Sequence, residues 1–229
     1  MAEAAKHAVI VGVGDGLSAS LARLLAREGY GLTLSARNTA KLEALVAETG
    51  ATAVACDSAE PEAVAALFAG LDGVPDVVIY NPSARTRGPI AELDPAEVKR
   101  AVEVTAFGAF LVGQQAARAM LPRGSGTILF TGASAGWKGF PHSAPFAMGK
   151  FALRGLAQSM ARELHPKGIH VGHINIDGAI RNPGRTEPAD APGSMLDPDA
   201  IAETYLMLIN QDRTTWTQEI EIRPWVERF

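Results

Sequence analysis

Three glycines near the amino end of the chain have the spacing of a phosphate-binding loop. Gly12, Gly14 and Gly16 follow a short apolar run, and Leu17 and Ser18 begin an amphipathic stretch directly after them. Glycines let a backbone approach a pyrophosphate closely, and a helix starting here would point free N–H groups at the phosphates. The spacing matches G-x-x-x-G-x-G, with Ser18 in place of the final glycine. We expect this loop, including the Ser18 hydroxyl, to bind a dinucleotide rather than to form a plain tight turn.

A basic residue ends the next apolar run, where dinucleotide-binding proteins distinguish their cofactors. An NAD-binding protein places an acid here for the ribose 2′-OH, whereas NADP needs a cation for its 2′-phosphate. Arg37 supplies the cation, Ala36 leaves the acid position empty, and Asn38 lies beside them. NADP is therefore favoured over NAD. Asp15 in the loop argues the other way, and a solvated arginine before a helix is the alternative for Arg37.

Polar residues also follow the third and fourth apolar runs. Asp57 and Ser58 come directly after the third run, where the edge of an adenine ring would lie. Asn81 follows the fourth run, beside the expected nicotinamide ribose. Asp and Asn are also the usual residues of turns and caps, so that interpretation stays open for both positions.

These positions require alternating strands and helices, and the chain has this pattern almost throughout. Seven apolar runs predict buried strands: Ala8–Val11, Leu32–Ser35, Ala51–Cys56, Val77–Tyr80, Thr127–Phe130, Ile169–Ile174 and Ile220–Ile222. Amphipathic stretches predict helices over Leu17–Glu28, after Asn38 or Thr39, over Ala63–Phe68, from Asp94 to Met120 with a break, over Ala144–Leu164 and from Asp197. Apolar strands separated by helices predict one α/β, doubly wound (Rossmann-like) parallel sheet of about seven strands with helices on both faces. Ligands then bind at the carboxyl ends of the strands.

Length and composition exclude several classes of protein. The 229 residues are 47% hydrophobic, which fits one domain over residues 1–229. A net charge of −4 without a basic block argues against nucleic-acid binding, and no apolar run is long enough to span a membrane. A single cysteine, Cys56, and the absence of a signal peptide indicate the cytoplasm, and scattered histidines give no metal site. Residues 181–195, rich in Pro, Gly and Asp, form either a surface loop or a mobile flap over a substrate.

With the glycine loop, Asp57, Asn81 and a long helix carrying Lys150 in register, the chain resembles the short-chain dehydrogenase/reductase family. The resemblance extends from Val9 to the last strand. It implies the family's fold, a nicotinamide cofactor and a small-molecule substrate. It also implies homodimers or homotetramers formed through the long helices.

Two further cofactor-binding segments of the family are partly kept. Its Asn-Asn-Ala-Gly stretch corresponds to residues 80–83, of which only Asn81 is retained. Its Pro-Gly after the sixth strand corresponds to Asp177 and Gly178, with Ile180 where the backbone usually meets the carboxamide. Lys150 is expected to bind the hydroxyls of the nicotinamide ribose, as its counterpart does in the family.

The catalytic positions that the family implies are mostly changed. The family uses Tyr-x-x-x-Lys, in which the lysine and the cofactor lower the pKa of a proton-donating phenol. Here Lys150 is present, but the tyrosine is Phe146, the serine position is Ala133 and the asparagine position is Thr105. None of the three tyrosines has a lysine four residues later: Tyr30, Tyr80 and Tyr205. A phenyl ring cannot donate a proton, so the family's usual carbonyl reduction is closed to this chain.

Two functions remain open. The first is an NADP(H)-dependent oxidoreductase with another proton source, for which Ser134, His142 and a water held by Lys150 are candidates. Ser134 and His142 could instead be ordinary loop residues. The substrate would be a small, apolar carbonyl, enone or imine, because four residues are expected to line an apolar pocket: Trp137, Phe140, Pro141 and Phe146. The second is an inactive NADP(H)-binding sensor or scaffold, which the loss of three catalytic groups favours.

Overall fold

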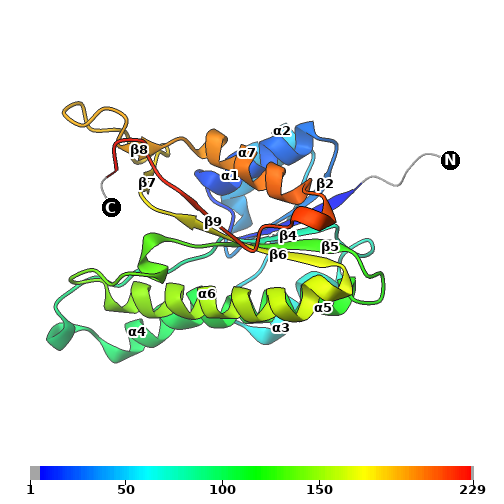
Figure 1. Ribbon diagram of the computed structural model, residues 1–229, viewed down its shortest axis with the longest axis horizontal. Helices are drawn as coiled ribbons and strands as arrows, with labels where there is room; N and C mark the ends of the chain where they lie inside the picture. The colour runs from blue at the N-terminus through cyan, green and yellow to red at the C-terminus, as the bar shows by residue number, and fades with distance from the viewer. Residues whose placement is uncertain (1–5, 228–229) are drawn as a thin grey trace.

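The computed structural model describes residues 6–227, which form a seven-stranded parallel sheet between two layers of helices (Figure 1). The ends of the expected domain, residues 1–5 and 228–229, lie outside the described residues. The sheet order is β3-β2-β1-β4-β5-β6-β9. The strands are β1 (His7–Val11), β2 (Gly31–Ala36), β3 (Thr52–Ala55), β4 (Val77–Tyr80), β5 (Gly126–Thr131), β6 (Ile169–Ile176) and β9 (Glu219–Ile222). The predicted doubly wound fold is confirmed.

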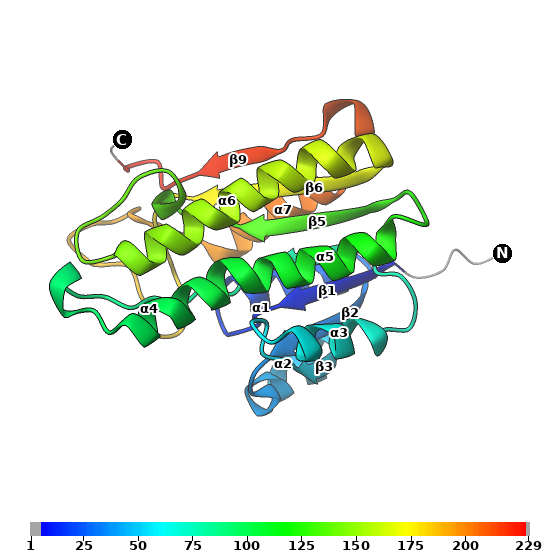
Figure 2. The same ribbon diagram turned by 90° about the horizontal axis from the view of Figure 1, so that it is seen from below.

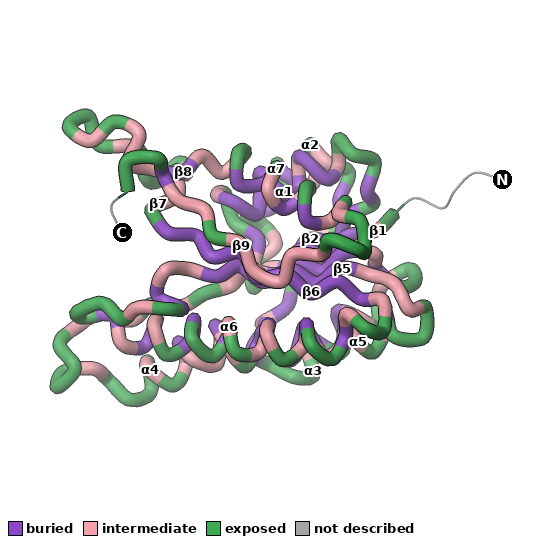
Figure 3. Tube along the Cα trace, viewed as in Figure 1, coloured by how far each residue is buried: buried purple, intermediate pink, exposed green. Residues whose placement is uncertain are grey.

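The helices cover both faces of the sheet and enclose two apolar cores. One face carries α1 (Leu17–Arg27), α2 (Glu43–Thr49) and α7 (Pro198–Ile209). The other carries α3 (Pro61–Ala69), α4 (Pro95–Val102), α5 (Gly108–Met120) and α6 (Ala144–Leu164), which Figure 2 shows from below. Buried residues concentrate in the strands and on the inward helix faces (Figure 3). No helix within the described residues is long and apolar enough to cross a membrane.

The strand register brings the predicted polar positions to one edge of the sheet. The chain places β2 and β3 on one side of β1 and then crosses over to place β4 on the other side. Val11 pairs with Tyr80, so Gly12 and Asn81 leave the sheet side by side. Such a crossover point is where ligands bind in open α/β sheets.

Helix starts follow the predicted capping residues. Asp94 accepts a hydrogen bond from the Ala96 N–H at 2.8 Å and begins α4, and Asp197 accepts one from Asp199 at 2.9 Å and begins α7. The break expected before Met120 is a π-helical turn, η3 (Glu103–Phe107), between α4 and α5. Turns of this kind insert one residue into a helix and often lie at functional sites.

Two short strands were absent from the predicted elements. Ala179–Ile180 (β7) and Met195–Leu196 (β8) pair in parallel and close off the segment between them, which contains most of residues 181–195. Within that segment, Glu187 accepts a hydrogen bond from the Met195 N–H at 3.1 Å. Strands of two residues have no measurable periodicity, so the sequence pattern could not indicate them.

Candidate active site

The glycine loop approaches β4 so closely that a side chain at Gly12 would clash. Gly12 has φ +82°, and a Cβ there would lie 2.5 Å from Cγ of Pro82. The N–H groups of Gly12 and Val13 both donate to the Ser35 carbonyl at 2.9 Å. Gly14 faces open space, with no atom within 4 Å of a Cβ built on it. The loop is therefore fixed at its base and leaves room for a ligand at its tip.

Ser18 and Asn81 connect the glycine loop to the end of β4 by hydrogen bonds. The Ser18 hydroxyl donates to the Gly12 carbonyl at 3.1 Å, and the Asn81 amide donates to the Ser18 oxygen at 2.6 Å. Ser18 is buried at the start of α1. In this structure the hydroxyl hydrogen is used within the loop, and the expected contact of Ser18 with a dinucleotide stays a prediction.

A cavity of about 500 Å³ lies beyond the loop, over the carboxyl ends of β1, β2 and β3. The sequence-predicted residues that line it are Gly12, Gly14, Arg37, Asn38, Asp57, Ser58 and Asn81. Arg37 and Lys41 supply two cations there, and Asp15 supplies a carboxylate. Asn38 accepts a hydrogen bond from the Ala40 N–H at 3.1 Å, so it caps the following turn. Sequence reasoning missed Lys41, which stands four residues after Arg37 and could have been found by that spacing.

Asp57 and Ser58 line the same cavity but already have protein partners. Asp57 pairs with Arg100 and accepts from the Ala59 N–H at 3.1 Å, as the turn interpretation of this residue predicted. The Ser58 hydroxyl lies 3.2 Å from the Tyr80 hydroxyl. Both side chains therefore already have hydrogen-bond partners within the protein.

Lys150 lies in a second, adjoining cavity of about 250 Å³. The sequence-predicted residues that line it are Gly16, Leu17, Asn81, Lys150, Gly178 and Ile180. The Lys150 ammonium donates to the Thr131 carbonyl at 2.6 Å and lies 5.8 Å from the centre of the Phe146 ring. Burial, and then the charge of Arg85, lower the pKa of Lys150 to about 7. The ammonium can therefore lose and regain a proton near neutral pH.

Gly178 lines this cavity, and Thr105 packs close to α6 outside its lining. Thr105, in η3, is fully buried and accepts a hydrogen bond from the Ala84 N–H at 3.1 Å. A Cβ at Gly149 would lie 2.7 Å from Cβ of Thr105, so α6 packs directly on the π-helical turn. Gly178 has φ +151°, and a Cβ there would lie 2.8 Å from Leu196.

A third cavity of about 690 Å³ adjoins the second beyond Phe146. Ser134 and His142 line this larger cavity, and Lys150 does not. His142 is exposed and holds φ +59°, and its carbonyl accepts a hydrogen bond from the Gly88 N–H at 3.2 Å. The structure thus separates the three predicted catalytic residues between two cavities.

The larger cavity is less apolar than the amino-acid sequence predicts. Phe140, Pro141 and Phe146 line it, but Trp137 lies outside the lining and is 40% exposed. Four cationic side chains line it as well: Arg85, Arg87, Lys138 and Arg185. Sequence reasoning missed all four; the only available signal was that the segment after Asn81 carries two arginines and no acid before Glu92.

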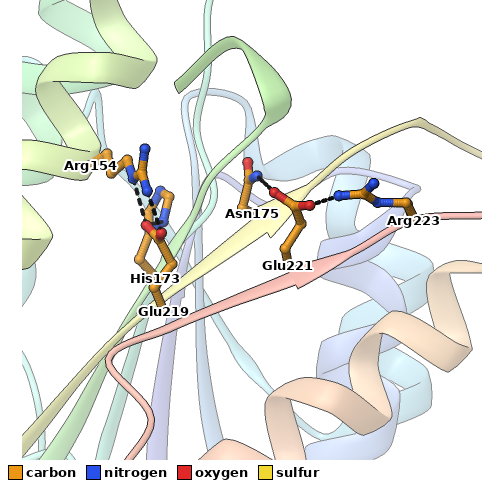
Figure 4. Close-up of polar contacts among 6 residues, drawn as sticks. All are labelled: Arg154, His173, Asn175, Glu219, Glu221 and Arg223. Carbon is orange, nitrogen blue, oxygen red and sulfur yellow. Dashed lines mark hydrogen bonds and ion pairs between the residues drawn. The ribbon is translucent and has the colours of Figure 1, made fainter. Parts of the chain in front are cut away.

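A partly buried polar cluster joins α6 to β9, the edge strand of the sheet (Figure 4). Arg154 of α6 donates two hydrogen bonds to Glu219 of β9, at 2.7 and 2.6 Å. Glu219 also lies 2.9 Å from Nδ1 of His173, a buried residue of β6. Beside it, Asn175 donates to Glu221 at 2.7 Å, and Glu221 pairs with Arg223. A Cβ at Gly132, which follows β5, would lie 2.4 Å from Nε2 of His173.

Comparisons with known proteins agree with this geometry. Residues 6–186 match the family described as short chain dehydrogenase. The chain is 36% identical to a crystallised short-chain dehydrogenase from Rhodopseudomonas palustris, with a TM-score of 0.83 over 96% of this chain and 99% of that one. It is 30% identical to the 2,5-dichloro-2,5-cyclohexadiene-1,4-diol dehydrogenase of Sphingobium indicum, over 90% of this chain and 82% of that protein.

A third similar protein is a metagenomic short-chain oxidoreductase solved in complex with NADP. It is 27% identical, with a TM-score of 0.85, and the match covers 96% of this chain and 98% of that one. The fold, the glycine loop at the crossover point and the match over most of the chain agree. This chain belongs to the short-chain dehydrogenase family of NAD(P)-dependent oxidoreductases.

Proposed function

We propose that this chain is an NADP(H)-dependent oxidoreductase of a small carbonyl, enone or imine substrate, and that Lys150 replaces the missing tyrosine as the proton source. The observation that carries the proposal is the position of Lys150. Its buried ammonium shares the 250 Å³ cavity with Phe146, Asn81 and Gly178. The nicotinamide cofactor, when bound, supplies hydride transfer chemistry.

The residues around the glycine loop fit such a cofactor. Only glycine can occupy position 12 against Pro82, and the open tip at Gly14 leaves space for phosphates. Arg37 and Lys41 border the same cavity and would attract a 2′-phosphate, which supports NADP over NAD.

Replacing Arg37 tests the preference for NADP. We expect Arg37→Ala to weaken NADPH binding about tenfold, a loss of about 1.4 kcal/mol, and to leave NADH binding unchanged. Fluorescence titration of reduced nicotinamide measures both affinities. Arg27→Ala, which removes an exposed arginine at the end of α1, is the matched control. Failure of the wild-type protein to bind either cofactor would refute the cofactor assignment.

Lys150 can act as the acid because it is held in place and titrates near neutrality. The hydrogen bond to the Thr131 carbonyl at 2.6 Å orients the ammonium, and Phe146 shields one side of it. A protonated Lys150 can give the proton at Nζ to the carbonyl oxygen or imine nitrogen of a substrate in this cavity. The family's tyrosine is then not required for reduction.

The pH dependence of reduction tests this role. Because the donor is the charged form, we expect NADPH-dependent reduction to fall about tenfold for each pH unit above 7. Lys150→Met should lose about 10²–10⁴-fold in kcat and lose this pH dependence. Activity is measured with a panel of aldehydes, ketones, enones and imines. The control variant is Lys167→Met, which replaces an exposed lysine.

Two other outcomes of this experiment would change the assignment. The Lys150→Met protein could bind NADPH poorly but keep its kcat. Lys150 would then act in cofactor binding only, and Ser134 and His142 would again be the candidates for the proton donor. Tight NADPH binding without turnover of any substrate would favour the inactive sensor or scaffold, which the changes at Phe146, Ala133 and Thr105 suggest.

Residues 181–195 contribute side chains to both cavities. Asn182 and Arg185 line the cavity that holds Lys150, and Arg185 also lines the larger one. These contributions support the proposal that residues 181–195 cover the substrate. They also support a single domain, because this segment and the cofactor-binding elements line the same cavities. Ser134 and His142, in the larger cavity, would then orient the substrate rather than protonate it.

A further inference from the structure

Three arginines surround the larger cavity without carboxylate partners of their own. Arg85 and Arg87 come from the segment after β4, and Arg185 comes from the segment between β7 and β8. Among residues 6–227, no carboxylate lies within 4.0 Å of these three guanidinium groups. Partial burial and the charges of Arg87 and Arg185 lower the pKa of Arg85. All three arginines are solvent-exposed, and like charges gathered at one cavity attract an anion to it.

The acids that line the same cavity do not balance these arginines. Asp177 is buried, and its carboxylate lies 4.0 Å from Nζ of Lys138 and 3.9 Å from Nε of Arg223. Glu227 is exposed at the rim. Asp177 thus offsets Lys138, and one rim carboxylate remains against three arginines.

Arg85 is positioned by the residue that replaced the catalytic tyrosine. Its guanidinium carbon lies 4.0 Å from the centre of the Phe146 ring, the distance of a stacked cation–π contact. Stacking covers one face of the guanidinium and leaves its N–H groups free to form two parallel hydrogen bonds to an anion. Arg85 also lines the cavity of Lys150, so an anion bound there lies next to the proposed proton donor.

We propose that the substrate carries an anionic group, a carboxylate or a phosphate, which Arg85 and Arg185 bind beside Phe146. The inference rests on the proposed function and narrows its substrate to an anionic carbonyl, enone or imine compound. Phe140, Pro141 and Phe146 would contact its apolar part. The cofactor phosphates do not explain Arg87 and Lys138, because these two cations line only the larger cavity, which contains no residue of the glycine loop. Arg85 and Arg185 line both this cavity and the one that contains Gly16, so the test below must separate their binding of substrate from binding of the cofactor.

Binding of three small ring compounds tests the proposal without requiring turnover. Benzoate and phenyl phosphate carry the anion, and benzamide has the shape of benzoate without its charge. Isothermal titration and thermal shift should detect binding of benzoate or phenyl phosphate. The affinity for benzamide should be at least tenfold weaker. The two anions distinguish a carboxylate from a phosphate site. Each titration is made on the cofactor-free and on the NADP-saturated protein, so that failure of the cofactor assignment is scored separately.

Arg85→Met keeps the length of the side chain and removes its charge. We expect it to weaken binding of the preferred anion at least tenfold, with benzamide and NADPH affinities unchanged. Arg27→Met, at an exposed arginine of α1, should change none of the four affinities. Equal binding of benzoate and benzamide to the wild-type protein would overturn the proposal. A loss of NADPH affinity in Arg85→Met would assign the arginine to the cofactor instead.

Discussion

At the scale of single residues, burial decides which side chains near the site carry a proton. His173 is 1% exposed, and burial lowers its pKa to about 4, even though Glu219 opposes this shift. Lys150 is equally buried, and its pKa is lowered to about 7. The charge of Lys150 adds to the shift at His173, so the two groups disfavour each other's protonated forms.

His173 should make the protein sensitive to mild acid. Its pKa in the unfolded chain is about 6.5, so the unfolded state binds the proton first as the pH falls. Stability is therefore complete above pH 6.5 and is lost as the pH falls toward 4, by about 2 kcal/mol between pH 7 and pH 5. Urea denaturation at both pH values measures this loss.

A matched variant isolates the contribution of His173. His173→Gln keeps a hydrogen-bonding side chain next to Glu219 and removes the titration, so its free energy of unfolding should change less between pH 7 and pH 5. Identical pH dependence in the two proteins would show that other groups cause the acid sensitivity.

Sequence reasoning reached residues whose role depends on position along the chain. Lys150 and Phe146 could be placed on one helix face, and Gly12 could be placed at a turn, because local spacing determines both. Arg85 could not be placed, because its contact with Phe146 joins segments that meet only in the folded chain. The contacts of Ser18 with Gly12 and Asn81 could not be predicted for the same reason, because they depend on how β4 lies beside the loop.

At the scale of elements, the site depends on the packing between the glycine loop and the segment after β4. Gly12 combines two separate constraints, a positive φ of +82° and a distance of 2.5 Å from a built Cβ to Pro82. Gly29 has the same φ, but nothing lies within 4 Å of its built Cβ. The two glycines therefore separate the effect of backbone strain from the effect of the close contact.

Alanine substitution at these glycines should give unequal losses. We expect Gly29→Ala to cost about 1 kcal/mol from the left-handed backbone alone. Gly12→Ala should cost about 1–3 kcal/mol more, because Pro82 must move, and it should also weaken NADPH binding. Urea denaturation and nicotinamide fluorescence measure the two effects. An equal loss of unfolding free energy in both variants would mean that Pro82 moves away from the new side chain at no energetic cost.

The main elements were predictable because each has a pattern of its own. The central strands β1 and β4 consist almost entirely of apolar residues, and the capping residues Asp94 and Asp197 predict the starts of two helices. β7 and β8 were missed because pairs of two residues are held by distant partners rather than by local preference.

At the scale of the whole molecule, one helical surface is more apolar than a monomer requires. Phe107, Phe110, Met148 and Phe151 lie on η3, α5 and α6, and each is more than 40% exposed. The rings of Phe107 and Phe110 stack with their centres 6.1 Å apart. Exposed clusters of this kind usually mark an interface between proteins. They support a homodimer or homotetramer formed through the long helices.

A charge placed on this surface should separate the subunits. We expect the wild-type protein to sediment as a dimer or tetramer at micromolar concentration, and Phe151→Glu to shift it toward the monomer. Met207 is 46% exposed on α7, on the opposite face of the sheet, so Met207→Glu should leave the mass unchanged. A monomeric wild-type protein in analytical ultracentrifugation would contradict this expectation.

The positions of the two described ends matter for how the protein is handled. Lys6 directly precedes β1, at the amino edge of the sheet, whereas Glu227 lines the cavity of about 690 Å³. A purification tag fused after Phe229 would begin within about 7 Å of chain from Glu227, and so close to that cavity. A polyhistidine tag there would also bring its own titrating charges to the arginines. Ligand screens with this protein should therefore use an amino-terminal tag, which hangs from the opposite edge of the sheet.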